Sequence, residues 1–271
     1  MKASDSSGSR KRRVTFRQAC WAALLTVAAC ATVAGAAPAG TLTLNAGLTI
    51  VSRPGACPAG LPASSFCTPR TGNGLVRGLG SVAVSYTWAL DTMPPGCGAG
   101  EAKILGYPVT LEVRGKGTLS LAVAGLGRCV PQLPSRNEPQ PFTIVGGSGV
   151  YAGATGSGTV ARELGQTAGG AAGPETFSGT LTVPELEFDV VAPVLTGMVP
   201  KSVRLVREAK RVRVRYSLAA RDAVDGAVRV VCQPRSGTWF PLGRTRVHCS
   251  ATDSSGNQAA RVFVVVVQRR G

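Results

Sequence analysis

The segment "CQPRSGTWFPLGRTRVHCSATDSSGN" (232–257) decides how the C-terminal part of the chain folds. Its run "RTRVHCSATD" (244–253) alternates apolar and polar residues, which predicts a strand with one buried and one solvated face. The inward face carries Val247, Cys249 and Ala251, and the outward face carries Arg246, His248 and Ser250. The upstream run "GAVRVVCQP" (226–234) places Cys232 on an inward face as well. We therefore expect a Cys232–Cys249 disulfide across the interior of a small sandwich, which removes about 3 kcal/mol of unfolded-chain entropy.

The whole chain has the composition of an all-β protein. Its 271 residues include 35 glycines and 18 prolines, and Val, Thr and Ala dominate its apolar runs. Such a composition favours many short strands joined by turns. We expect an antiparallel β-barrel or sandwich over 41–188, because segments such as "GTLTLNAGLTIV" and "GSVAVSYTWAL" alternate and are bounded by Gly or Pro. The prolines of "DVVAPVLTGMVP" (189–200) predict a boundary, with a second domain over 189–271.

The first 36 residues have the pattern of a secretory signal peptide. A basic stretch (10–18) precedes an Ala-rich apolar stretch (19–37), and Ala34-Gly35-Ala36 fits a signal peptidase site. The run "VAAC" (27–30) is similar to a bacterial lipoprotein signal, in which Cys30 would carry the lipid and give the only membrane attachment. An uncleaved anchor is the third possibility. The sequence thus predicts a secreted or cell-surface protein.

Charge is distributed unevenly along the chain. Removing residues 1–36 lowers the formal net charge from +16 to +11. Residues 37–188 carry 9 Lys and Arg against 8 Asp and Glu, whereas residues 189–271 carry 15 against 5. This asymmetry indicates either an anionic partner for the second domain or a device for solubility alone.

The cysteine count agrees with export. Cys20 and Cys30 lie in the signal, which leaves Cys57, Cys67, Cys97, Cys129, Cys232 and Cys249. An even number of cysteines in an exported chain predicts disulfides, and the absence of a CxxC pair argues against zinc. The four N-terminal cysteines allow three pairings. The Pro-, Gly- and Ser-rich stretch "PGACPAGLPASSFCTP" favours a local Cys57–Cys67 loop, with Cys97–Cys129 as the second bridge.

The C-terminal 83 residues resemble a hyalin-repeat (HYR) domain. The resemblance rests on D-x-x-A-P (189–193), A-x-D-x-x-D-G (220–226), the pattern C-x-P-x-S-G-x-x-F-P-L-G-x-T-x-V-x-C-x-A-T-D-x-x-G-N (232–257) and F-x-V-x-V (263–267). It implies an immunoglobulin-like β-sandwich and an extracellular interaction or adhesion role.

A weaker resemblance concerns "PFTIVGGSGVYAGATGSGTV" (141–160), which is similar to a glycine-rich stretch of allene oxide cyclase and dirigent barrels. Those proteins are calycin-like, eight-stranded barrels that enclose a small hydrophobic or phenolic ligand. The resemblance implies a small-ligand carrier or a cyclase-like enzyme, and it assigns no ligand-contacting residue to this chain.

The candidates for catalysis and metal binding are weak. The one histidine, His248, lies on an outward strand face, and no G-x-S-x-G motif supplies a nucleophile. Glu185 and Glu187 share one face of a predicted strand, which is not how glycosidase carboxylates flank a substrate. Asp222, Asp225 and Asp253 lie in turns, where capping is the expected role and calcium binding the alternative. We expect no catalytic residue, no metal site and no cofactor.

Arginines alternate with apolar residues in "KRVRVRYSLAARDAVDG" (210–226). Arg211, Arg213 and Arg215 share the outward face of a predicted strand, where they form a candidate anion-binding ladder. The same arginines would also protect an edge strand from aggregation. We expect a non-catalytic surface protein whose basic sandwich contacts an anionic envelope polymer, an extracellular polymer or another surface protein.

Overall fold

The computed structural model describes residues 40–131, 138–200, 202–205 and 210–269. The predicted signal peptide (1–36), its cleavage site and Cys30 lie outside the described residues. Within those residues, no helix has the length and hydrophobicity needed to cross a membrane.

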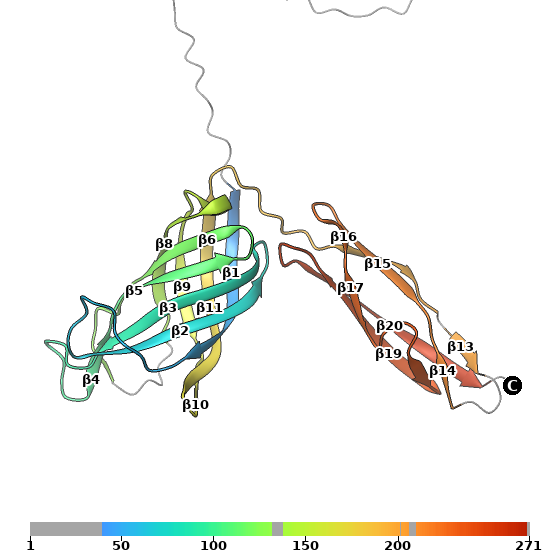
Figure 1. Cartoon of the computed structure of the whole chain (residues 1–271), viewed down its shortest axis with the longest axis horizontal. Coiled ribbons are helices and arrows are strands. Elements are labelled where there is room, and N and C mark those ends of the chain that lie inside the picture. Colours follow the sequence, from blue (N-terminus) through green and yellow to red (C-terminus); the bar gives the residue numbers. More distant parts are fainter. Residues whose placement is uncertain (1–39, 132–137, 201, 206–209, 270–271) are drawn as a thin grey trace, which may run out of the picture. The chain divides into compact units, whose positions relative to one another are not determined.

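Eight antiparallel strands of the N-terminal part close into a barrel (Figure 1). Each strand pairs with the next one along the chain, and the last pairs with the first, so the barrel is an up-and-down meander. The strands are β1 (Gly40–Ser52), β2 (Ser65–Val76), β3 (Gly80–Asp91), β5 (Tyr107–Val113), β6 (Gly117–Val123), β8 (Gln140–Gly147), β9 (Thr155–Arg162) and β11 (Gly170–Val183). The sequence left barrel and sandwich open, and the closing β1–β11 and β1–β2 pairings show the barrel.

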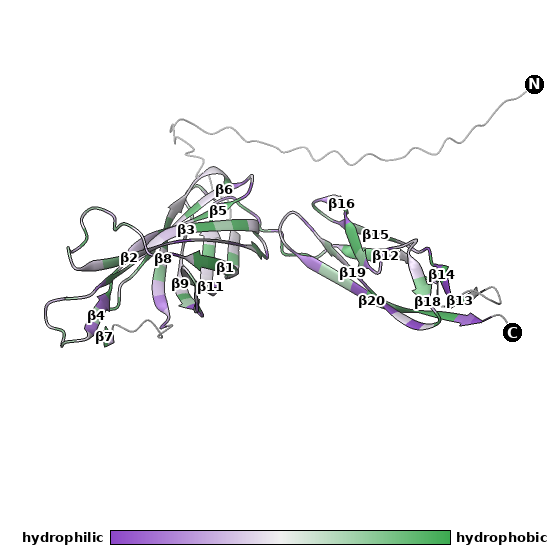
Figure 2. Cartoon of the chain, turned by 60° about the horizontal axis from the view of Figure 1, so that its bottom comes forward, coloured by the Kyte–Doolittle hydropathy of each residue, from purple (hydrophilic) through white to green (hydrophobic). Residues whose placement is uncertain are grey.

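The alternation of apolar residues builds the barrel interior. In β1, every second residue from Leu42 to Ser52 is buried and the residues between them are exposed. Figure 2 shows green apolar residues on the barrel strands. The inward residues form one cluster, in which the rings of Phe142 and Phe177 lie 5.9 Å apart. The barrel centre is therefore packed with side chains over much of its length.

Glycines let neighbouring strands approach closely in the β8–β9–β11 region. Gly158 of β9 lies opposite Gly179 of β11. A Cβ atom on Gly158 would lie 2.1 Å from the Ser178 carbonyl oxygen and 2.7 Å from Cζ of Phe142. The glycine-rich stretch 141–160 forms the β8–β9 hairpin, with the short 3₁₀ turn η1 (Gly149–Tyr151) between its strands.

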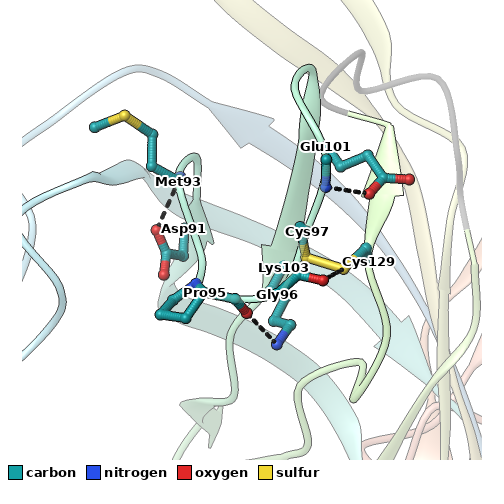
Figure 3. Close-up of a disulfide and its surroundings, with 9 residues drawn as sticks. Asp91, Met93, Pro95, Gly96, Cys97, Glu101, Lys103 and Cys129 are labelled. Carbon is teal, nitrogen blue, oxygen red and sulfur yellow. Dashed lines mark hydrogen bonds between the residues drawn. A yellow bond between two sulfur atoms is a disulfide. The ribbon is translucent and has the colours of Figure 1, made fainter.

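Short strands extend one end of the barrel. They are β4 (Glu101–Ile104), β7 (Val130–Pro131) and β10 (Gly165–Thr167). The disulfides Cys57–Cys67 and Cys97–Cys129 hold the long loops of this end, as predicted. Figure 3 shows the Cys97–Cys129 bridge. A satellite core of Leu90, Ala102, Ile104 and Val130 lies beneath these loops.

The C-terminal part consists of three small sheets around a second core. Their strands are β12 (Val194–Met198), β15 (Ser217–Asp222) and β16 (Gly226–Val228) in the first; β13 (Ser202–Leu205), β20 (Gln258–Arg269), β19 (Gly243–Thr252) and β17 (Val230–Gln233) in the second; and β14 (Arg211–Arg213) with β18 (Trp239–Pro241) in the third. The core between them contains Val214, Phe240, Val247, Cys249, Val265 and Val267. Cys232 and Cys249 form the predicted disulfide, but they lie opposite each other in the β17–β19 ladder, so the bridge joins neighbouring strands of one sheet and does not cross the interior.

Two predicted strands differ from those in the structure. The alternating run 211–218 is not one strand, because β14 pairs with β18 whereas β15 pairs with β12 and β16. At the change of partner, the Ser236 hydroxyl accepts from the Tyr216 amide and donates to the Tyr216 carbonyl. Likewise β11 ends at Val183, and Glu185 has a φ of 59°, so Glu185 and Glu187 do not share a strand face.

The Cys232–Cys249 bridge is expected to carry a large share of the C-terminal stability, because few side chains of that core are fully buried. Replacing both cysteines with alanine should lower the free energy of unfolding by about 3 kcal/mol. Urea denaturation followed by the fluorescence of Trp239 would measure the loss. The matched control is the Cys57→Ala/Cys67→Ala pair, which should leave this transition unchanged. An unchanged midpoint in the Cys232/Cys249 variant would contradict the prediction.

Candidate functional site

A network of buried polar side chains lies inside the barrel. Glu175 of β11 is 0% exposed and stands opposite Arg162 of β9 in the strand register. Arg162 Nε lies 2.9 Å from Glu175 Oε1, and the Tyr86 hydroxyl donates a hydrogen bond to Glu175 Oε2. One oxygen of the Glu175 carboxylate therefore faces a cation and the other accepts a hydrogen bond from a hydroxyl. These two contacts reduce the free-energy cost of burying the carboxylate.

The network continues from Arg162 to β8 and β5. Arg162 Nη1 donates to Gln140 Oε1 at 2.6 Å, and Gln140 Nε2 donates to the Ala124 carbonyl at 2.8 Å. The Arg162 guanidinium also lies 5.6 Å from the ring centre of Tyr107, which stacks on Tyr86. These contacts hold Arg162 in one orientation, yet its Nη2 atom is buried and has no hydrogen-bond partner.

Arg70 of β2 is a second buried cation, only 7% exposed. It donates to the Tyr86 hydroxyl at 3.3 Å and to Thr68 Oγ1 at 3.4 Å, and its guanidinium lies 4.9 Å from the ring centre of Trp88. In the part of the chain that the structure describes, no carboxylate forms an ion pair with Arg70. The network thus contains two guanidinium groups and one carboxylate, and its formal net charge is +1.

A cavity of 310 Å³ opens beside this network. Arg70 and Arg162 line it together with mainly apolar side chains, among them Phe66, Trp88, Leu90 and Leu164. Its size and lining are typical of a small-molecule site, with an apolar wall and a few fixed polar groups. The arrangement suits a molecule with an apolar body and an anionic or acceptor group that faces the guanidinium groups.

Burial controls the acid–base state of the tyrosines. Burial, followed by the nearby charge of Glu175, raises the pKa of the Tyr86 hydroxyl to about 12. Tyr86 is therefore a neutral hydrogen-bond donor at physiological pH. Burial also raises the pKa of Tyr151 to about 12.

Sequence reasoning missed this network, although a signal was present. Glu175 has the same parity in its strand as the inward residues Phe177, Leu181 and Val183. Arg162, Gln140, Tyr86 and Tyr107 continue inward rows in the same way. A charged residue that continues an apolar row is the pattern that would have found them.

Only part of the predicted arginine ladder lies on a strand, since Arg211 and Arg213 belong to β14 whereas Arg215 lies beyond its end. Arg211, Arg213 and Arg215 are all exposed, whereas Val214 between them is buried. The Arg213 guanidinium lies 5.2 Å from the ring centre of the exposed Trp239. His248 is exposed, as the predicted outward position requires.

The predicted capping role of the acidic turns is confirmed. Asp222 Oδ1 accepts hydrogen bonds from the amides of Val224 and Asp225, which lower the pKa of its carboxyl below the ordinary value. Asp253 Oδ1 accepts from the amides of Ser255 and Asn257. The turns also bring Asp222, Asp225 and Asp253 together with Asp189.

A second group of potential metal ligands has no free thiolate. Cys97, Glu101 and Cys129 lie close together, but the two sulfur atoms are joined in a disulfide (Figure 3). The Glu101 carboxylate accepts a hydrogen bond from the Gly98 amide. This group therefore serves to hold a loop.

Comparison with protein families identifies the C-terminal part. The family model described as "HYR domain" matches residues 189–267. Residues 189–267 form a HYR domain. HYR domains are extracellular, adhesion-type modules, and the three disulfides of this chain are compatible with that location.

A search of curated proteins finds no match to the chain. The resemblance of residues 141–160 to allene oxide cyclase and dirigent barrels stays a prediction. The barrel site must be interpreted from its own residues.

The buried Tyr86 should make the barrel sensitive to alkaline pH. Tyrosine in the unfolded chain ionises near pH 10, whereas Tyr86 in the fold ionises near pH 12. The group does not weaken the fold below pH 10, and stability should fall by about 2 to 3 kcal/mol as the pH rises from about 10 to about 12. Urea midpoints and tyrosinate absorbance across this range would measure the effect. In Tyr86→Phe, the fall in stability should be smaller by this amount, and the contributions of Tyr151 and Tyr216, whose pKa values are also raised, should remain. An identical pH profile would disprove the assignment.

Proposed function

We propose that the protein is an exported, non-enzymatic binding protein that attaches to an anionic envelope or extracellular polymer through its HYR domain. After export, the mature chain would begin after Ala36 or at a lipidated Cys30, or the signal segment would stay as an uncleaved anchor. The observation that carries the proposal is the exposure of Arg211, Arg213 and Arg215 on one edge of a domain whose residues 189–271 carry a formal net charge of +10.

The geometry of this ladder suits a repeating anion. Arg211 and Arg213 lie on one face of β14, where residues two apart are separated by about 6.5–7 Å, and Arg215 follows just beyond the end of that strand. Each guanidinium can contact a carboxylate, sulfate or phosphate group through two parallel hydrogen bonds. The Trp239 ring beside Arg213 adds an exposed flat surface on which a sugar or a base can lie. A polyanion is therefore favoured over an uncharged surface protein as the partner.

We expect the triple variant Arg211→Ala/Arg213→Ala/Arg215→Ala to bind heparin or an anionic wall polymer at least about tenfold more weakly, with a smaller dependence on salt. Binding isotherms at several salt concentrations would measure both changes. The matched control is Arg235→Ala/Arg244→Ala/Arg246→Ala, which removes the same charge from other exposed positions. Equal losses in the two variants would indicate attraction by net charge alone and would disprove the ladder.

A second function is favoured by the barrel cavity. We propose that the barrel carries a small molecule with an apolar body and a carboxylate or similar anionic group. Arg70 supports this proposal, because a buried cation without a carboxylate partner is costly until an anion approaches it. The free Nη2 of Arg162 is a second donor that such a ligand would satisfy.

A fluorescent fatty acid and its methyl ester would test the carrier function. We expect the acid to bind, the ester to bind more weakly, and Arg70→Met to reduce binding of the acid about 10- to 100-fold with little effect on the ester. Arg114→Met is the control, since Arg114 is exposed and does not line the cavity. Equal binding of acid and ester by the unaltered protein would refute the anionic head group.

A further inference from the structure

The acidic side chains of the HYR domain are gathered at one place. Asp189, Asp222, Asp225 and Asp253 are the only acidic residues of residues 189–271 that the structure describes. Each contributes a carboxylate oxygen to a group in which all four atoms lie within 4.8 Å of one another. Carboxylates at this distance repel one another, so the arrangement is unfavourable without a counter-ion. An arginine would be a more favourable neighbour for each carboxylate than three other carboxylates are.

Several oxygens of this cluster lack a hydrogen-bond partner although they are buried. They are Oδ2 of Asp189, Oδ2 of Asp222 and Oδ1 of Asn257. Asp222 is 8% exposed and Asn257 is 1% exposed. The Asn257 amide belongs to the cluster, since its Nδ2 donates to Asp253 Oδ2 at 2.9 Å and to the Asp189 carbonyl at 3.1 Å. An unsatisfied buried acceptor is costly, and the unpartnered oxygens of Asp189 and Asp222, two carboxylates of this cluster, favour a bound cation.

The protein itself supplies no such cation in the described part of the chain. No lysine or arginine there forms an ion pair with any of the four carboxylates. Backbone amides satisfy only part of the acceptor capacity: Asp222 and Asp253 each use Oδ1 to cap their own turn, and Asp189 Oδ1 accepts from the Val191 amide. The remaining negative charge is left without a counter-charge.

We propose that the four carboxylates form a binding site for one Ca²⁺ ion. All of these donors are hard oxygen atoms, which Ca²⁺ prefers, and neither a thiolate nor an imidazole that would favour Zn²⁺ belongs to the group. Ca²⁺ accepts irregular oxygen cages of six to eight ligands, whereas Mg²⁺ demands a near-ideal octahedron. Asp225 is exposed and provides the entry side, and water completes the coordination shell.

The ion would join segments that are distant in sequence. Asp189 begins the domain, Asp222 ends β15, Asp225 lies in the following turn, and Asp253 follows β19. Ca²⁺ would therefore stabilise these loops against one another. This role is independent of the arginine ladder and of the barrel cavity.

Calorimetry on the intact, disulfide-bonded protein tests the proposal. After treatment with EDTA, titration with CaCl₂ should show binding of one ion per chain, and saturating Ca²⁺ should raise the melting temperature of the HYR transition by about 10 °C. Asp225→Asn should weaken Ca²⁺ binding at least about tenfold, because it removes one ligand charge. This variant should fold, since Asp225 is exposed and its carboxylate bonds only to Ser254.

Two controls make the result decisive. Asp91→Asn changes a turn-capping aspartate of the barrel that belongs to neither group of potential metal ligands in the described residues, and it should bind Ca²⁺ as the unaltered protein does. MgCl₂ should bind much more weakly than CaCl₂. Absence of Ca²⁺ binding by the unaltered protein, equal binding by Asp225→Asn, or equal affinity for Mg²⁺ would each overturn the proposal.

Discussion

Closure of the eight-stranded sheet is the constraint on which the N-terminal structure depends. In a closed barrel, every second residue of every strand points into the interior. Closure also leaves no edge strand with unpaired backbone groups. Most inward rows are filled with Leu, Val, Ile and Phe. Glu175, Arg162 and Arg70 occupy inward positions of their strands and are buried. A buried charge is costly unless another group inside the barrel pairs with it.

The polar network follows from that constraint. Glu175 contacts Arg162 and Tyr86, whereas the partners of Arg70 among the described residues are hydroxyl groups and aromatic rings. One part of the barrel interior is thus packed with apolar side chains, whereas another part holds more positive than negative charge. The cavity adjoins this second part, where Arg70 and Arg162 line it. A bound anion would offset the cost of burying Arg70, so the proposed ligand would also stabilise the barrel.

The HYR domain separates its charges instead of pairing them. Its strands place arginines outward around a small apolar core, and its turns gather the carboxylates at one site. The Cys232–Cys249 bridge compensates for the size of the core. A domain of this kind has a cationic face that suits a polyanion and a concentrated anionic site that suits a metal ion.

Local patterns in the amino-acid sequence determine much of this protein. The period-two alternation and the glycine-rich turns predict the all-β class and the outward arginines, and the motifs of residues 189–267 carry the resemblance to the HYR domain. The cysteine positions favour the three disulfides that the structure has, although the four N-terminal cysteines allow three pairings. The sequence did not predict that β14 and β15 belong to different sheets, or that β11 ends at Val183. Both features depend on which strand pairs with each segment, and alternation does not show that. Only the tertiary structure decided that the sheet closes, that Glu175 meets Arg162 and that four aspartates converge. Such contacts join residues far apart in the chain, and alternation gives the direction of a side chain but not the identity of the group it meets.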